Sequence, residues 1–161
     1  MKQQSEFCAW FSGFAAGEGS FGIRHRQNRA GGEWQVRFDL VLRRDDRAIL
    51  ERLAAQHGGR LYNEDTKPSG GVKRPSPSVR WVIYRLAECR RLVEHFRRYP
   101  LYAKKQRDFE LWAMAVEHLS LGGKHRNNEY MEGLRLALVA GRVYDAEEQA
   151  SPSMSQLRLL A

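Results

Sequence analysis

The first helix that the sequence predicts carries a stripe of residues with almost no side chain. Residues 6–17 have the apolar density of a buried helix, and Ala9, Gly13 and Gly17 recur at every fourth position on one face. Each interior glycine lowers helix stability by roughly 1 kcal/mol relative to alanine, which favours a place where another backbone approaches closely. Tight packing inside one chain is one explanation. Two identical helices meeting across a two-fold axis fit better, because such a contact needs a self-complementary surface.

An acidic residue follows this stripe. Glu18 lies at the expected C-terminal end of the helix, where the helix dipole disfavours a carboxylate by about 0.3–1 kcal/mol and a bound cation would reverse that sign. If two helices cross at the stripe, two copies of Glu18 come together, and paired carboxylates are a natural site for a hard divalent metal ion. A solvated acid at a helix end is the alternative.

Alternation of apolar and polar residues predicts an antiparallel sheet with one covered face. Residues 20–28 and 34–43 form a predicted hairpin, and residues 60–65 and 78–85 predict two further strands, with amphipathic helices after each pair. The predicted order is αββαββα, an α+β fold in one domain over residues 1–120. We expect residues 121–161 to form a C-terminal extension with one helix at about 128–140 and a partly disordered tail.

The polar face of the predicted sheet is rich in Arg, Asn and Gln, which suits reading of the DNA major groove. Arginine pairs bidentately with guanine, Asn or Gln with adenine, and an acidic side chain accepts from cytosine. A solvent-facing sheet surface is the alternative at each position. The candidate DNA-binding residues are Arg24, Arg26, Asn28, Gln35, Arg37, Asp39, Arg43, Asn63, Asp65, Arg80 and Tyr84.

The charge of the chain also points to a polyanionic partner. The formal net charge is +8, and the surplus lies within residues 1–120, because the remaining residues carry as many acids as bases. Cys8 and Cys89 lack the spacing of a zinc site or a disulfide framework. No apolar run approaches about 18 residues and no signal-peptide layout is present, so we expect a cytoplasmic protein without membrane contact and without a small-molecule substrate.

One segment adds a family resemblance to these patterns. Residues 11–19, FSGFAAGEG, strongly resemble the LAGLIDADG motif of homing endonucleases. Residues 100–109, PLYAKKQRDF, are similar to the proline, lysine-pair and Asp-Phe pattern of that family, and the likeness extends to about residue 120. The resemblance implies a saddle-shaped antiparallel sheet that receives DNA, with the helices packed on its other face.

The resemblance also implies an activity. A homodimer of such chains would bind a long, near-palindromic double-stranded DNA site and hydrolyse phosphodiesters on both strands with Mg²⁺, with Mn²⁺ or Ca²⁺ able to substitute in binding. Glu18 and the Gly17 carbonyl stand at the metal-binding position, and Lys104 or Lys105 maps beside the scissile phosphate. The subunit interface would contain Ala9, Ser12, Gly13, Ala16 and Gly17.

The sequence departs from the family pattern at two positions. Ala16 replaces a motif residue that is commonly acidic, although that position is not the catalytic acid. Leu42 stands where members often carry a glutamine that positions water beside the metal. Leu42 therefore keeps open a DNA-binding regulator or an intron-splicing maturase that retains the fold without cleavage. An RNA-binding or membrane-surface protein rests on charge alone.

Overall fold

The computed structural model describes residues 2–27, 32–64, 77–123 and 127–141. The predicted αββαββα order is confirmed, with one short 3-10 turn before the second helix and two further helices after the third. The elements are α1 (Lys2–Glu18), β1 (Ser20–Arg26), β2 (Glu33–Arg43), η1 (Arg44–Asp46), α2 (Arg47–His57), β3 (Arg60–Glu64), β4 (Ser78–Ile83), α3 (Leu86–Arg98), α4 (Lys104–Ser120) and α5 (Asn128–Ala140).

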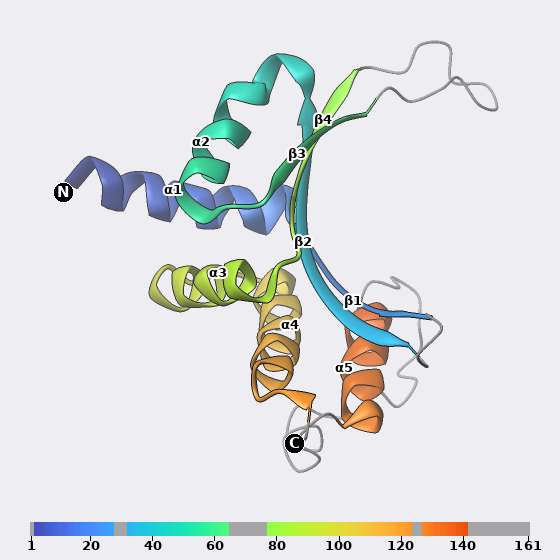
Figure 1. The fold of residues 1–161 in the computed structure, drawn as a ribbon. Coiled ribbons are helices and arrows are strands. Elements are labelled where there is room, and N and C mark those ends of the chain that lie inside the picture. The colour runs from blue at the N-terminus through green and yellow to red at the C-terminus, as the bar shows by residue number, and fades with distance from the viewer. Residues whose placement is uncertain (1, 28–31, 65–76, 124–126, 142–161) are drawn as a thin grey trace.

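The four strands form one antiparallel sheet in the order β1-β2-β4-β3. Phe38 on β2 lies opposite Phe21 on β1 and Ile83 on β4, so apolar side chains from neighbouring strands share one face. We call this the inner face and the opposite one the outer face. Figure 1 shows a strongly curved sheet with the helices on its convex, inner side and no labelled helix across its concave side.

Aromatic residues fill the space between the inner face and the helices. Phe11 of α1 is fully buried, with its ring centroid 6.0 Å from that of Trp81 and 5.3 Å from that of Phe96. The Trp81 indole donates to the carbonyl of Gly58 at 2.8 Å, so its polar atom is satisfied inside the core. This packing joins α1, β4 and α3, and it holds the outer face turned away from the helices.

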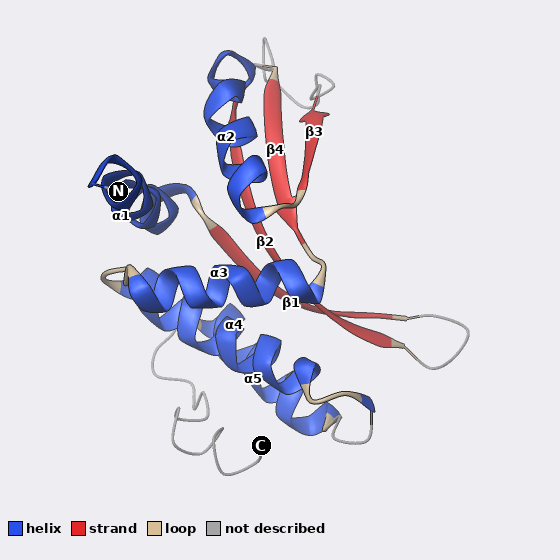
Figure 2. Cartoon of the chain, turned by 60° about the vertical axis from the view of Figure 1, so that its left-hand side comes forward, coloured by secondary structure: helices blue, strands red, loops and turns tan. Residues whose placement is uncertain are grey.

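The last helix belongs to the same core. Figure 2 shows α4 and α5 side by side beneath the β1–β2 hairpin. The Trp34 indole on β2 donates to the Asn128 side chain at 3.0 Å, and the Asn127 side chain caps α5 by accepting from the Tyr130 amide at 3.0 Å. The predicted helix at 128–140 thus coincides with α5, and the predicted tail lies within residues 142–161, outside the described part of the chain.

Cys8 and Cys89 are both buried free thiols, and burial raises the pKa of Cys89 to about 12. Within the described ranges, no helix combines the length and apolar character needed to span a lipid bilayer.

Two histidines are buried between α1, α2 and α3. The His57 and His95 rings meet edge to face with centroids 4.8 Å apart, and both pack against Phe11. Burial lowers the pKa of His57 to about 4, with further lowering from His95 and Arg91, and burial likewise lowers the pKa of His95 to about 4. Both rings are therefore neutral in the folded protein near neutral pH.

We expect the free energy of unfolding to fall as the pH drops from about 6.5 toward about 4. In that window the unfolded chain binds protons at His57 and His95 that the folded chain does not. The two neutral histidines therefore contribute fully to the free energy of unfolding only above about pH 6.5. Urea denaturation followed by tryptophan fluorescence across this range measures the slope. The free energy of unfolding should fall less with pH in a His57→Phe variant. In a His25→Gln variant, which removes an exposed histidine, it should depend on pH as in the wild type. Equal pH dependence of the free energy of unfolding in the wild type and in His57→Phe would contradict this explanation.

Candidate nucleic-acid interface

One face of α1 is open to solvent where the glycines lie. Gly13 and Gly17 are exposed, and a Cβ atom added to either would meet no atom within 4 Å outside its own helix turn. Ala9 on the same stripe is also exposed. Close packing inside the protomer therefore does not explain these glycines, and the stripe lies free for an external contact.

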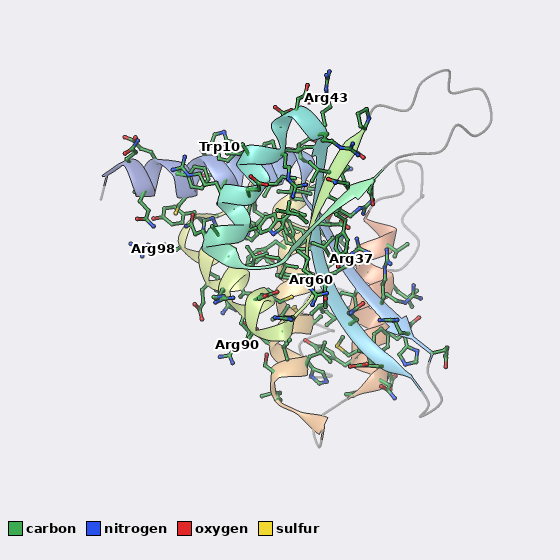
Figure 3. All side chains as sticks on the ribbon, turned by 45° about the horizontal axis from the view of Figure 1, so that its top comes forward. Trp10, Arg37, Arg43, Arg60, Arg90 and Arg98 are labelled. Carbon is green, nitrogen blue, oxygen red and sulfur yellow. The ribbon has the colours of Figure 1, made fainter. Side chains whose placement is uncertain are left out.

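A row of aromatic rings borders this stripe. Phe7, Trp10 and Phe14 stack with centroids 5.3 Å and 4.9 Å apart, and the Arg52 guanidinium of α2 lies 3.7 Å from the centre of the Phe7 ring. Trp10 is 43% exposed, and Figure 3 labels it on α1. Our sequence reasoning assigned no contact role to these residues, although their spacing of three and four places them on one helix face.

Ser12 was predicted to lie in the subunit interface, but the structure covers its side chain within the chain itself. Only 3% of Ser12 is exposed, and its hydroxyl donates to the carbonyl of Tyr99 at 2.7 Å. Its side chain therefore ties α1 to the end of α3 inside the protomer. Ala16 is half-buried and borders a hollow of about 370 Å³ together with the two lysines at the start of α4.

The end of α1 is fixed by a contact that only glycine permits. A Cβ atom on Gly19 would lie 2.5 Å from the carbonyl oxygen of Ala15 and 2.8 Å from the Phe38 ring. The Gly19 amide donates to that same Ala15 carbonyl at 2.9 Å, which closes the last turn. Glu18, the preceding residue, is exposed, so its carboxylate stands at the rim of the sheet in a defined place.

The structure separates the roles of the two predicted lysines. The Lys105 ammonium donates to the Gly19 carbonyl at 2.8 Å, directly beside the acidic end of α1. Lys104 is exposed at the first position of α4 and borders the same hollow as Lys105 and Ala16. Both cations thus lie near the end of the motif, and Lys105 contacts its backbone.

The chain places the exposed Glu18 carboxylate at this end. Among the described residues, no three His, Cys, Asp or Glu side chains converge as they would around a bound metal ion. The oxygen atoms at the end of α1, from Glu18 and the backbone carbonyls, are of the kind that Mg²⁺ and Ca²⁺ prefer. They fit part of the coordination shell of a hard cation, and the rest must come from elsewhere.

The outer face carries most of the predicted DNA-binding side chains. Arg24 on β1 lies opposite Gln35 on β2, and Arg37 lies opposite Gly22 two pairs further along, on the same face. The other predicted residues described on this side are Arg26, Arg43, Arg80 and Tyr84. Figure 3 shows Arg37, Arg43 and Arg60 along the sheet, while Arg90 and Arg98 project from α3. Asn28 and Asp65 lie outside the described residues.

Asn63 on β3 was predicted to lie on the outer face of the sheet, and this prediction was wrong. Asn63 pairs with the buried Val79 and so lies on the inner side of the sheet. Although Asn63 also borders an outer-face hollow of about 460 Å³, its side-chain oxygen accepts from Arg47 of α2 at 2.8 Å. The outer-face residues of β3 are Arg60, Tyr62 and Glu64, none of which we predicted as DNA contacts.

Asp39 is not a free acceptor for a base. Its carboxylate is 8% exposed and lies between two arginines, accepting from Arg37 and, at 2.9 Å, from Arg80. Arg80 also donates twice to Glu64, at 2.6 Å and 3.2 Å. Burial, and then the nearby Arg24 and Arg80, lower the pKa of Arg37.

Leu42, at the position where a glutamine was expected, is half-buried and packs against the core from the inner face.

The profile of the LAGLIDADG endonucleases matches residues 11–116 of this sequence, about two thirds of the chain. The chain belongs to the LAGLIDADG endonuclease family. A curated relative from Schizosaccharomyces pombe, named "Probable intron-encoded endonuclease Cox1-I1b", is 28% identical over an alignment of 134 residues, and the match covers 78% of this chain and 32% of the relative. This chain therefore spans about a third of the length of that relative.

Solved structures of LAGLIDADG homing endonucleases share the fold. I-SmaMI bound to cleaved DNA superposes with a TM-score of 0.71 at 18% identity, over 84% of this chain and 45% of that one. I-TnaI matches with a TM-score of 0.64 at 20% identity, over 95% of this chain and 94% of its own. I-AabMI bound to uncleaved DNA has a TM-score of 0.64 and 26% identity, over 91% of this chain and 53% of its own.

In this LAGLIDADG chain, Gly19→Ala should lower the free energy of unfolding by about 1–3 kcal/mol, because the new methyl group must displace backbone or the Phe38 ring. Gly123→Ala adds the same group where no atom lies within 4 Å, and it should cost much less. Urea denaturation of both variants beside the wild type measures the difference. Equal stabilities for the two variants would show that α1 meets the sheet less closely than described.

Proposed function

We propose that this chain is a site-specific DNA endonuclease that binds double-stranded DNA as a homodimer and hydrolyses a phosphodiester on each strand with a divalent metal ion. The observation that carries the proposal is the position of α1. Its exposed glycine stripe and its terminal acid, Glu18, lie together at the rim of a curved sheet whose free face carries arginines. Association of two copies along the stripe would bring two such acids together between two DNA-binding surfaces.

Charge and shape support DNA as the ligand. The concave face of the sheet carries Arg24, Arg26 and Arg37 on neighbouring strands, and the chain has a formal charge of +8. Neutralisation of phosphates by such residues releases counterions and dominates affinity for duplex DNA. The related I-SmaMI and I-AabMI were solved bound to DNA, which accords with this assignment.

The open stripe supports a dimer of identical subunits. Gly13 and Gly17 present bare backbone, and Trp10 beside them exposes an apolar surface that a second α1 could cover. This chain also aligns with 45% of the I-SmaMI chain, so two copies would supply about as much of the fold as that protein holds in one chain.

A divalent ion, Mg²⁺ in our proposal, would be held by Glu18 from each copy and by the Gly17 carbonyl. I-SmaMI was solved with an uncleaved DNA target in the presence of calcium ions, in accord with a hard-cation site. Such an ion activates water and stabilises the charge that develops on the attacking and leaving oxygens. Lys105, anchored to the Gly19 carbonyl, places a positive charge beside that end, and Lys104 adds a second, exposed one.

Leu42 supports a second candidate, a DNA-binding regulator or intron-splicing maturase that does not cleave. Its apolar side chain packs into the core and offers no hydrogen bond to a metal-bound water. Incubation of the wild-type protein with a randomised duplex library, with and without Mg²⁺, separates the two. Enrichment of bound sequences without any metal-dependent cleavage would favour the non-cleaving function.

The Glu18→Gln variant should abolish cleavage of the selected site while largely retaining DNA binding, because it removes the metal-binding charge and keeps the side-chain volume. Gel-shift and cleavage assays on the same duplex measure the two properties. Glu6→Gln, which removes an exposed acid near the other end of α1, is the matched control and should cut normally. Metal-dependent cleavage by Glu18→Gln would contradict the assignment of Glu18 as the metal-binding residue.

The Gly13→Leu variant should sediment as a monomer or aggregate, because two helix backbones cannot approach across a leucine side chain. The helix itself should persist, since leucine has a higher helix propensity than glycine. Gly123→Leu places the same side chain in open space away from α1 and should remain dimeric. A normal dimer of Gly13→Leu in analytical ultracentrifugation would place the interface elsewhere.

A further inference from the structure

Four charged side chains form a connected network at the middle of the outer face. The Asp39 carboxylate accepts from Arg37 on its own strand and from Nη1 of Arg80 on β4 at 2.9 Å. Glu64 on the edge strand β3 accepts from Nε and Nη2 of the same Arg80 at 2.6 Å and 3.2 Å. The network therefore crosses three strands, and Asp39 stands at the centre of it.

The two arginines differ in how fully they are engaged. All three nitrogens of the Arg80 guanidinium donate within the network. Arg37 uses one nitrogen, Nη2, among the residues that the structure describes. A guanidinium with unused donors in a fixed fork can still pair with the O6 and N7 acceptors of guanine, whereas a fully engaged one must first break ion pairs. Arg37 is thus the better placed of the two for base reading.

Both arginines border the outer-face hollow of about 460 Å³, whose walls include Tyr62 and Tyr84. The Arg37 side chain is 18% exposed, and the Asp39 side chain below it is 10% exposed. A long side chain that is mostly covered and tied to a buried carboxylate has few rotamers left. The guanidinium of Arg37 is consequently held at this hollow before any ligand arrives.

We propose that Asp39 is a positioning residue that holds Arg37 in the orientation in which it reads a guanine, while Arg80 pairs with Asp39 from the neighbouring strand β4. This inference rests on the proposed function in DNA binding and adds the group that fixes one base-reading side chain. Asp39 itself contacts no base. Its negative charge faces a polyanion and weakens general affinity, so its contribution is to discrimination between sequences.

The Asp39→Asn variant should separate the effect of Asp39 on general DNA affinity from its effect on discrimination between sequences. It keeps the side-chain size and removes the charge that orders Arg37. Preference for the favoured base at the position that Arg37 reads should fall about 3- to 10-fold, in line with the loss of one preordered side chain. Affinity for unrelated duplex DNA should stay equal or rise, because an acidic charge has left the binding face. A purely structural role for Asp39 would lower stability and leave base preferences unchanged.

The experiment is selection from a randomised duplex library in metal-free buffer with four proteins: wild type, Asp39→Asn, Arg37→Ala and Glu64→Gln. Asp39→Asn and Arg37→Ala should flatten preference at the same base position, in mirror-related positions of both half-sites. Glu64→Gln is the matched control, since it removes an equal charge from the network but contacts Arg80 rather than Arg37. It should leave that position unaffected.

Two results would overturn the inference: wild-type base preferences in Asp39→Asn, or flattening at a position that Arg37→Ala leaves intact. Should Asp39→Asn fail to fold, Asp39→Glu replaces it, because glutamate keeps the negative charge but shifts the carboxylate relative to Arg37 by one methylene group. Asp39→Glu must then flatten the same position as Arg37→Ala. If the wild type selects sequences and the variants do not flatten the base preference at the position that Arg37 reads, the inference about Asp39 fails and the proposed function stands. If wild type enriches no sequence at all, the proposed function fails with it.

Discussion

The close contact of Gly19 with Phe38 sets the geometry of the whole site. Because the chain passes within van der Waals limits of the sheet at this point, α1 has little freedom in where it ends and β1 in where it begins. Glu18 is therefore placed at the rim of the sheet, and the Gly19 carbonyl is available to Lys105 from α4. The positions of the acid, the lysine and the first strand of the proposed DNA-binding face all depend on that one glycine.

Much of this arrangement could be predicted from alternation and helical spacing. On β1, β2 and β4 the apolar residues alternate apart from Val41 and Val82, so the alternation assigned Arg24, Arg37 and Arg80 to the outer face correctly. On β3 the five residues offer Leu61 and Tyr62 side by side, and no pattern decides between the faces. Pairing with β4 decides it, which places Asn63 inward and Tyr62 outward.

Two further features depend on partners that are distant in the sequence. Ser12 shares a helix face with small exposed residues, yet its hydroxyl reaches the Tyr99 carbonyl 87 residues further along the chain. The ion pair between Asp39 and Arg80 joins residues 41 positions apart. Spacing rules describe one helix or one strand at a time, so they give the face of a residue but not the neighbour that covers or engages it.

The location of Glu18 and the glycine stripe on a single helix links assembly to chemistry in the proposed dimer. Each chain carries one Glu18, so a pair of Glu18 carboxylates exists only in molecules that have associated. By mass action the concentration of such pairs falls with the square of protein concentration once dimers dissociate. An enzyme built in this way would lose activity faster than its own concentration falls, because only associated chains hold both acids.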